Sequence, residues 1–331
     1  LAREMYDKKT ALLAAAFCLF APLFLIQSGT FLPYASSFLF NLLFALFFVK
    51  SLKGDSKIYP IVAGLALGVG AFSRPLTTLL FALPFIAYSL YLVSGQEVAK
   101  YIKKFGLLVV AVLPFLALIA AYNYYMTGSP TQFPFVAYEP LDRFGFGIKR
   151  MAPFAPTYVY NISAALTSSR ATVLSLTEWA FGGFLSLAII LFYFISFRPN
   201  KYDLLLLGLF PSIIVGEALH WGQYNLSEIW KALDYLGPIY HFDLLLPLSL
   251  LASRGLVSLL HTLQPRPDRE AIWLSPRVNM VALVVILLGT NALYLSQKID
   301  LNYQYTQKFR DIAQTLKEKD TSNSIIFLPT P

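Results

Sequence analysis

Long apolar runs, separated by short clusters of charged residues, are the main pattern along this chain. Each run is close to the roughly 20 residues that a helix needs to cross a bilayer. Their spacing predicts about nine membrane-spanning helices, at 10–28, 31–49, 58–72, 76–94, 105–126, 174–197, 203–220, 236–260 and 278–296. The predicted fold class is therefore an all-α transmembrane protein.

Two segments lie outside these predicted spans. Residues 127–173 form one long connection, and the tail from 297 is largely polar. Apolar residues recur in the tail near helical spacing, and a short strand-like run follows from Ser324. We expect a transmembrane domain over 1–296 and the start of a soluble α/β or β domain over 297–331. Because residue 1 is Leu rather than Met and the chain stops in this run, we expect a fragment of a longer protein.

The composition supports a membrane protein. Hydrophobic residues make up 57% of the 331 positions, charged residues only 13%, and the mean hydropathy is +0.60. A soluble domain carries about 25% charged residues, so a disordered chain and almost any soluble enzyme are excluded. The single cysteine, Cys18, has no partner for an internal disulfide, which excludes a disulfide-stapled secreted module.

The charged residues predict an orientation in the membrane. Lys and Arg gather in alternate connections, while the other short connections hold little more than Arg74 and Lys231. The positive-inside rule then places the N-terminus in the cytoplasm, and 127–173 and the tail outside. A multi-pass protein of the plasma membrane follows. In this context the net charge of +8 indicates topology, and we expect no nucleic-acid partner.

The segment 127–173 is rich in Tyr, Phe, Pro and Gly. One interpretation is an interfacial belt, in which aromatic rings lie at the headgroup level and cations touch anionic lipid. The other is a binding lid, because aromatic faces stack on sugars and cations hold phosphate. The candidate residues here are Tyr138 for sugar or acceptor, and Arg143, Lys149 and Arg150 for phosphate. Glu139 and Asp142 are the catalytic candidates, as groups that orient sugar hydroxyls or act as a base; the alternative is that they cap a turn.

A few ionisable residues lie in or near the predicted spans, where a charge costs roughly 2.5–3.5 kcal/mol. Arg74 stands in the turn Ser73-Arg74-Pro75 after a short apolar arm, so it should lie below the outer headgroups at the bottom of a cavity. We predict that it binds a lipid phosphate; the alternative is that it snorkels or pairs with a neighbouring helix. Glu217 and His220 lie near the outer end of the seventh span. His241 and Asp243, at the start of the eighth, are candidates for sugar or acceptor binding.

Motifs for other chemistries are missing from the sequence. It contains no P-loop, no GxGxxG after a strand, no GxSxG elbow and no zinc-ligand spacing. We therefore expect no cofactor and no dedicated metal site, and leave the use of a divalent ion open. The run Gly64-x-x-x-Gly68-x-Gly70 lies inside a span and predicts close helix packing.

The run from Gly64 to Pro75 (GLALGVGAFSRP), followed by a second apolar arm, resembles polytopic glycosyltransferases of the GT-C class. The nearest group is the dolichyl-phosphate-mannose mannosyltransferase and aminoarabinose transferase relatives. Thr127-Gly-Ser-Pro and the block from Tyr138 to Gly147 resemble the external loop of prokaryotic members. Gly237-Pro-Ile-Tyr is similar to a Gly-Pro-Arg-Tyr pattern, with Ile239 in place of Arg.

This resemblance implies a sugar transferred from a polyprenyl-phosphate donor to a glycan, lipid or protein acceptor at the outer membrane face. It also implies an acidic base in an external loop after the first span. Leu1–Lys9 resembles the stretch that follows that loop, so we expect the base to be missing here and assign it to no other residue. Phosphate contacts are assigned to Arg74, Arg143, Lys149 and Arg150, since positive charge stabilises the leaving group.

Two other functions stay open at this point. A transporter or flippase of lipid-linked substrates would share the membrane fold, but only one broken hairpin is apparent and transporters often carry two. A non-catalytic membrane scaffold whose external domain binds a partner is also compatible with the sequence.

Overall fold

The computed structural model describes residues 1–30, 32–95, 97–262 and 276–318. Helices dominate this part of the chain, and its one sheet is a small antiparallel pair. The predicted class, a helical protein with apolar spans, is confirmed at this level.

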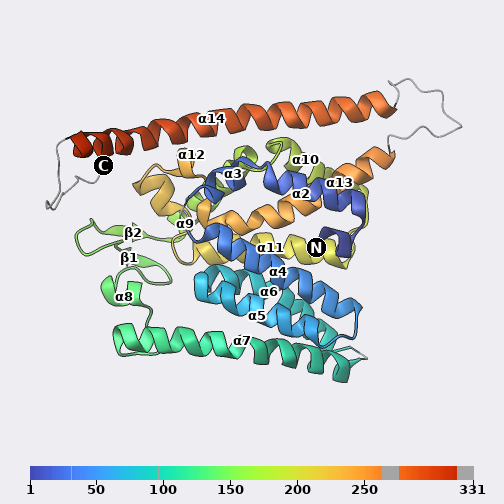
Figure 1. The fold of residues 1–331 in the computed structure, drawn as a ribbon, viewed down its shortest axis with the longest axis horizontal. Helices are drawn as coiled ribbons and strands as arrows, with labels where there is room; N and C mark the ends of the chain where they lie inside the picture. Colours follow the sequence, from blue (N-terminus) through green and yellow to red (C-terminus); the bar gives the residue numbers. More distant parts are fainter. Residues whose placement is uncertain (31, 96, 263–275, 319–331) are drawn as a thin grey trace, which may run out of the picture.

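The first 127 residues form seven helices, of which the long ones run back and forth through the bundle (Figure 1). Local sequence sets several of their ends. The side chain of Asp7 accepts the backbone N–H of Thr10 and begins the second helix, and Pro22 and Pro75 each stand in a first helical turn. Gly128, in the left-handed region, ends the seventh. The helices are α1 (Ala2–Met5), α2 (Lys8–Leu19), α3 (Pro22–Ser28), α4 (Tyr34–Lys53), α5 (Ile58–Ser73), α6 (Pro75–Val93) and α7 (Val98–Thr127).

The rest of the chain is more broken. Its elements are α8 (Pro134–Tyr138), β1 (Gly147–Lys149), β2 (Tyr158–Tyr160), α9 (Ile162–Trp179), α10 (Phe184–Ser196), α11 (Lys201–Ala218), a π-helix η1 (Asn225–Ile229), α12 (Leu233–Leu236), a 3-10 helix η2 (Ile239–Leu244), α13 (Leu245–Thr262) and α14 (Pro276–Glu318). The strands pair with Ile148 opposite Val159. This hairpin and α8 lie within the connection predicted at 127–173, whose last part, from Ile162, is already helix α9.

The bundle has a buried centre and two exposed edges. Helix α13 lies inside, with most of its side chains buried. Helices α7 and α14 lie along opposite edges (Figure 1) and expose many apolar residues. Helix α7 packs closely on α5 because glycines face it: a Cβ at Gly64 would clash with the Leu108 carbonyl, and one at Gly68 with the Phe115 ring. The predicted role of this glycine run in helix packing is confirmed.

The number of spans differs from the predicted nine. Among the described residues, five helices are long and apolar enough to cross a membrane, or up to seven if each bent helix pair is one span. Helices α2 and α3 meet at 57°, and α9 and α10 at 104°. Gly182 and Gly183 have positive φ at the second bend, so 174–197 is no single helix. The Asn291 side chain hydrogen-bonds the backbone at both bends, to the Phe20 carbonyl and the Gly182 N–H.

The predicted boundary at 297 falls inside one continuous helix, since α14 runs from Pro276 to Glu318. Its polar half is tied to the bundle by an ion pair of Lys298 with Glu178 and by stacking of Tyr305 on Tyr235. The strand expected from Ser324 lies outside the described residues. A separate domain over 297–331 stays a prediction.

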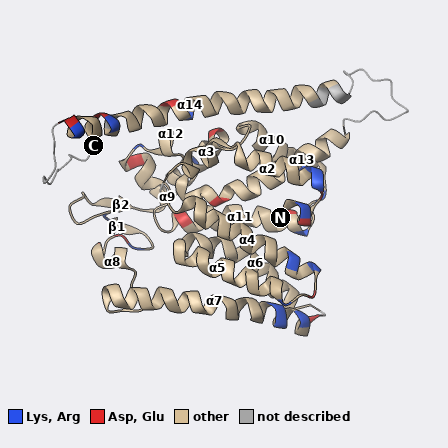
Figure 2. Cartoon of the chain, in the orientation of Figure 1, with Lys and Arg blue, Asp and Glu red and all other residues tan. Residues whose placement is uncertain are grey.

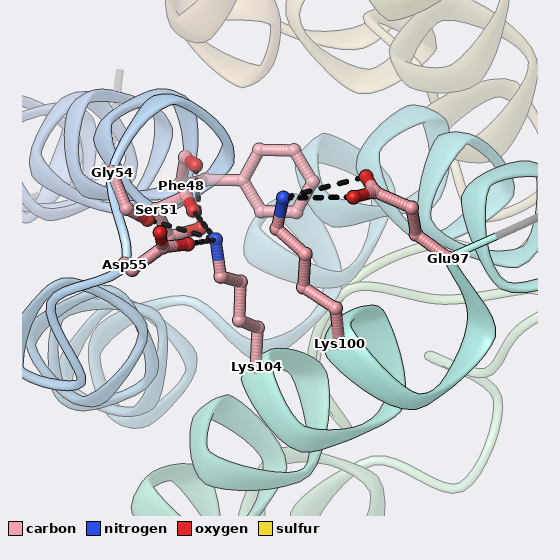
Figure 3. Close-up of polar contacts among 7 residues, drawn as sticks. All are labelled: Phe48, Ser51, Gly54, Asp55, Glu97, Lys100 and Lys104. Atoms are coloured by element: carbon pink, nitrogen blue, oxygen red, sulfur yellow. Dashed lines mark hydrogen bonds and ion pairs between the residues drawn. The ribbon is translucent and has the colours of Figure 1, made fainter.

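Positive charge is concentrated at one end of the bundle. Figure 2 shows Lys and Arg around the N-terminus, the C-terminal end of α4 and the N-terminal end of α7, and a second charged group at the C-terminal end of α14. At the first end, the Lys104 ammonium donates to the carbonyls of Ser51 and Gly54 and pairs with Asp55 (Figure 3). These carbonyls terminate α4, so Lys104 caps that helix.

Candidate functional site

A cavity of about 910 Å³ opens at the end of the bundle where α8 and the hairpin lie (Figure 1). Its wall is formed by the α5–α6 junction, the C-terminal ends of α7 and α11, and residues of the connection after α7. Apolar and aromatic side chains make up most of the lining. The ionisable side chains in it are Arg74, Tyr122, Glu217, His220 and Tyr240.

Arg74 is held in this wall by the turn between two helices. It ends α5, with its N–H donating to the Gly70 carbonyl, and begins α6 by accepting the Thr78 N–H. Its guanidinium lies 4.1 Å from the ring centroid of Tyr34 and 5.8 Å from that of Tyr240. The aromatic faces attract the cation but accept no in-plane hydrogen bond. Its Nη1 is buried and has no hydrogen-bond partner among the described residues.

A carboxylate lines the same cavity. Glu217, only 4% exposed, accepts a 2.9 Å hydrogen bond from the Thr77 hydroxyl. It comes from the last turn of α11. Thr77 lies in the first turn of α6, the helix that begins directly after Arg74. The cavity therefore presents one cation and one anion on neighbouring helices.

The connection after α7 is anchored over the cavity by hydrogen bonds with residues 218–221. The Tyr160 hydroxyl donates to the Ala218 carbonyl at 2.6 Å, and the Gly145 N–H to the Leu219 carbonyl at 2.7 Å. The indole N–H of Trp221 donates to Asp142 at 2.7 Å. These contacts place Phe144 in the cavity wall, with its ring stacked 6.5 Å from that of His220.

Lys149 takes part in this anchoring. Its ammonium donates to the carbonyls of Arg143 and His220, and lies 4.9 Å from the ring centroid of Tyr160 and 5.1 Å from that of Trp221. Burial lowers the pKa of the Lys149 ammonium to about 8. In this arrangement two of its three N–H donors bind backbone carbonyls.

Three other charged side chains of the connection, Glu139, Asp142 and Arg150, are paired or hydrogen-bonded. Arg150 donates to Glu139 at 2.7 Å, and this hydrogen bond holds the pKa of the Glu139 carboxyl below its usual range. Asp142 accepts from Trp221 and lies 3.5 Å from the His220 ring nitrogen. Arg143 and Tyr138 are exposed, Tyr138 at 61%.

A second polar cluster is buried next to the cavity and does not line it. The Asn41 amide donates to Asp243 at 2.8 Å, and the Gln223 amide nitrogen lies 2.9 Å from Nδ1 of His241. All four side chains are at most 1% exposed. The 3-10 turn η2 carries both His241 and Asp243, with His241 at its kink.

The candidate residues predicted from the sequence thus differ in whether they line the cavity. Arg74 lines the cavity, as expected for a residue at the bottom of one. The loop candidates Tyr138, Glu139, Asp142, Arg143, Lys149 and Arg150 lie around it without lining it, and His241 and Asp243 lie inside the bundle. The sequence prediction gave no role to Glu217, Tyr34 or Tyr240. An acidic residue near the end of an apolar span, such as Glu217, could have been recognised as a candidate.

Within 1–30, 32–95, 97–262 and 276–318, no group of three His, Cys, Asp or Glu side chains could hold a metal ion.

Comparison with known proteins agrees with the resemblance seen in the sequence. The family model described as dolichyl-phosphate-mannose-protein mannosyltransferase matches residues 1–125, which include Arg74 and its Tyr34 neighbour. Searches of curated proteins and of solved structures gave no match. The family match and the apolar helices support a membrane glycosyltransferase of the GT-C kind.

Proposed function

We propose that this chain transfers a sugar from a polyprenyl-phosphate donor to an acceptor at the outer membrane face. The cavity holds the donor phosphate next to Arg74, and the apolar wall takes the first isoprene units. The observation that carries this proposal is the guanidinium stacked on Tyr34, with Nη1 buried and unpartnered beside a cavity of about 910 Å³. A buried cation with an unused donor needs an anion or water to satisfy it.

The cavity lining fits an amphipathic ligand. Phe72, Leu79, Phe133 and Phe135 provide apolar surface for a hydrocarbon chain, and Arg74 provides the single guanidinium for a phosphate. Arginine binds phosphate through paired N–H donors. In the transfer step the phosphate gains negative charge as the bond to the sugar breaks, and a fixed cation stabilises that change.

The test is binding of farnesyl phosphate, a short polyprenyl phosphate, to the purified chain in detergent. Arg74→Met should raise the dissociation constant about 10- to 100-fold, because a charge-assisted hydrogen bond contributes about 1.5–3 kcal/mol. Arg143→Met is the matched control, since Arg143 lies nearby but outside the cavity wall, and its effect should be under about twofold. Equal affinity for wild type and Arg74→Met would contradict the proposal.

A second assay separates an enzyme from a transporter. Proteoliposomes are supplied with radiolabelled polyprenyl-phosphate hexose or pentose and with the acceptor fraction of cell membranes. A glycosyltransferase releases polyprenyl phosphate and labels the acceptor, whereas a flippase moves the intact donor between leaflets. Relocation of uncleaved donor would favour the transporter.

A further inference from the structure

We infer that Glu217 compensates charge in the cavity by taking up a proton when a phosphate monoester occupies it and releasing the proton when the monoester leaves. This inference rests on the proposed function, since it requires a phosphate next to Arg74. It adds a role for a carboxyl group that neither the sequence motifs nor the family match assigns. The group concerned is the single acidic side chain in the described cavity lining.

The first step is the charge count at the site. With the cavity empty, Arg74 and Glu217 bring one positive and one negative charge to the same apolar wall. A sugar-phosphate diester adds one negative charge, and the free phosphate monoester adds about two at neutral pH. Because the lining is mostly apolar, each uncompensated charge is costly there. A carboxylate next to a dianion is therefore the group in this site that a proton most readily neutralises.

The second step is the placement of Glu217. The side chain is 4% exposed, and one of its oxygens is held by the Thr77 hydroxyl at 2.9 Å. No ion pair of Glu217 occurs among the described residues, whereas Glu139 is clamped by Arg150 and Glu178 by Lys298. Glu217 therefore keeps a carboxyl oxygen that no cation of the described residues pairs with, and Glu217 lines the cavity.

The surroundings contain few competing groups. The titratable and charged side chains that act on Glu217 come from the α5–α6 junction, from α4, from η2 and from the segment after α11; they are Arg74, Tyr34, Tyr240, Asp243 and His220. Asp243 is outside the cavity lining and already accepts the Asn41 amide. His220 lies 3.5 Å from Asp142, but its Nε2 makes no hydrogen bond among the described residues, so proton uptake that persists in Glu217→Gln would point to His220 instead. Arg74 and Glu217 are thus the oppositely charged pair that a bound phosphate meets.

The transfer reaction itself makes this coupling useful. The acceptor oxygen forms a bond to the sugar carbon, the bond from that carbon to the phosphate oxygen breaks, and the electron pair stays on the phosphate. The acceptor hydroxyl loses one proton, and the diester monoanion becomes a monoester dianion. If Glu217 holds that proton, the net charge of the site is the same before and after transfer. The proton leaves when polyprenyl phosphate dissociates.

The test counts protons during binding. Farnesyl phosphate is titrated into the purified chain by calorimetry in two buffers of different ionisation enthalpy, at intervals from pH 6 to pH 9. Wild type should take up as much as about one proton more than Glu217→Gln within this range, and the methyl ester of farnesyl phosphate, a monoanion, should show a smaller difference. Glu178→Gln, which removes a carboxylate outside the cavity lining, should behave as wild type.

Each outcome separates the two proposals. Equal proton uptake by wild type and Glu217→Gln at every pH, with binding retained, would overturn the role of Glu217 and leave the phosphate site standing. Binding that does not depend on Arg74 would overturn the proposed function as well. If Glu217→Gln fails to fold, Thr77→Val decides: it removes a hydrogen bond that favours the carboxylate, so maximal uptake should move to higher pH. An unchanged profile would contradict the inference.

Discussion

Two cations at opposite ends of the bundle, Lys104 and Arg74, differ in how their donors are used. Lys104 is 7% exposed, and its ammonium contacts the Ser51 and Gly54 carbonyls and Asp55. Arg74 lies against the ring of Tyr34, with Tyr240 close by, and its Nη1 has no partner in the described residues. The first cation completes the end of helix α4. The second keeps a donor that no described residue fills.

This difference indicates which buried charge serves stability and which serves binding. A buried cation whose donors are filled by backbone carbonyls contributes to folding, because removing it leaves those carbonyls unsatisfied. A buried cation with an open donor costs stability and is retained for a ligand. The comparison predicts that a substitution at Lys104 lowers stability and leaves phosphate affinity unchanged, whereas a substitution at Arg74 lowers phosphate affinity with a smaller effect on stability.

The largest effect on stability is expected at Lys104. Lys104→Met should lower the free energy of unfolding by about 1–3 kcal/mol, since it leaves helix-terminal carbonyls without a donor. Lys100→Met is the matched control on the same helix: Lys100 is exposed, pairs only with Glu97 (Figure 3), and should change stability little. Unfolding of the purified variants in detergent gives the comparison, with farnesyl phosphate binding unchanged in both.

Arg74→Met should lower the free energy of unfolding by less than Lys104→Met does, because it leaves no helix-terminal carbonyl without its donor. The same unfolding measurement checks this. A loss of stability as large as that of Lys104→Met would show that Arg74 is a structural residue, and the comparison would fail.

The smallest effect is expected on the pH dependence of the free energy of unfolding, and it comes from a third buried cation, Lys149. Its folded pKa is about 8, against an ordinary value of 10.5. Between these values the unfolded chain holds a proton that the folded chain has lost, so the free energy of unfolding rises with pH; below pH 8 the contribution is constant. The stability difference between wild type and Lys149→Met should therefore move in favour of wild type from pH 7.5 to pH 10. A difference independent of pH would contradict the lowered pKa.

Much of the helical framework could be predicted from the sequence because the spacing of apolar residues and the length of apolar runs are local signals. The turn at Arg74, the packing of Gly64 against α7 and the helix ends near Pro75 and Gly128 all follow from such signals. The bends at residues 20–21 and 180–183 were not predicted. They depend on Asn291, far along the chain, which hydrogen-bonds the backbone at both places.

The site was predicted only in part for the same reason. Arg74 was recognisable, since a charge between two apolar arms needs a special environment. The partners of Lys149 and Arg150 were not, because a basic residue in a loop has the same local pattern whether it faces a ligand or a carbonyl of residue 220. Tyr34 and Tyr240 come from helices that only the folded chain brings together around Arg74.

The most direct test of the central claim is an experimental structure of the chain with bound farnesyl phosphate. We predict density for the phosphate within hydrogen-bond distance of the Arg74 guanidinium, with the isoprene chain along the apolar cavity wall. A phosphate bound instead at Arg143 or at the basic end near Lys104, with the cavity beside Arg74 holding no ligand, would contradict the claim.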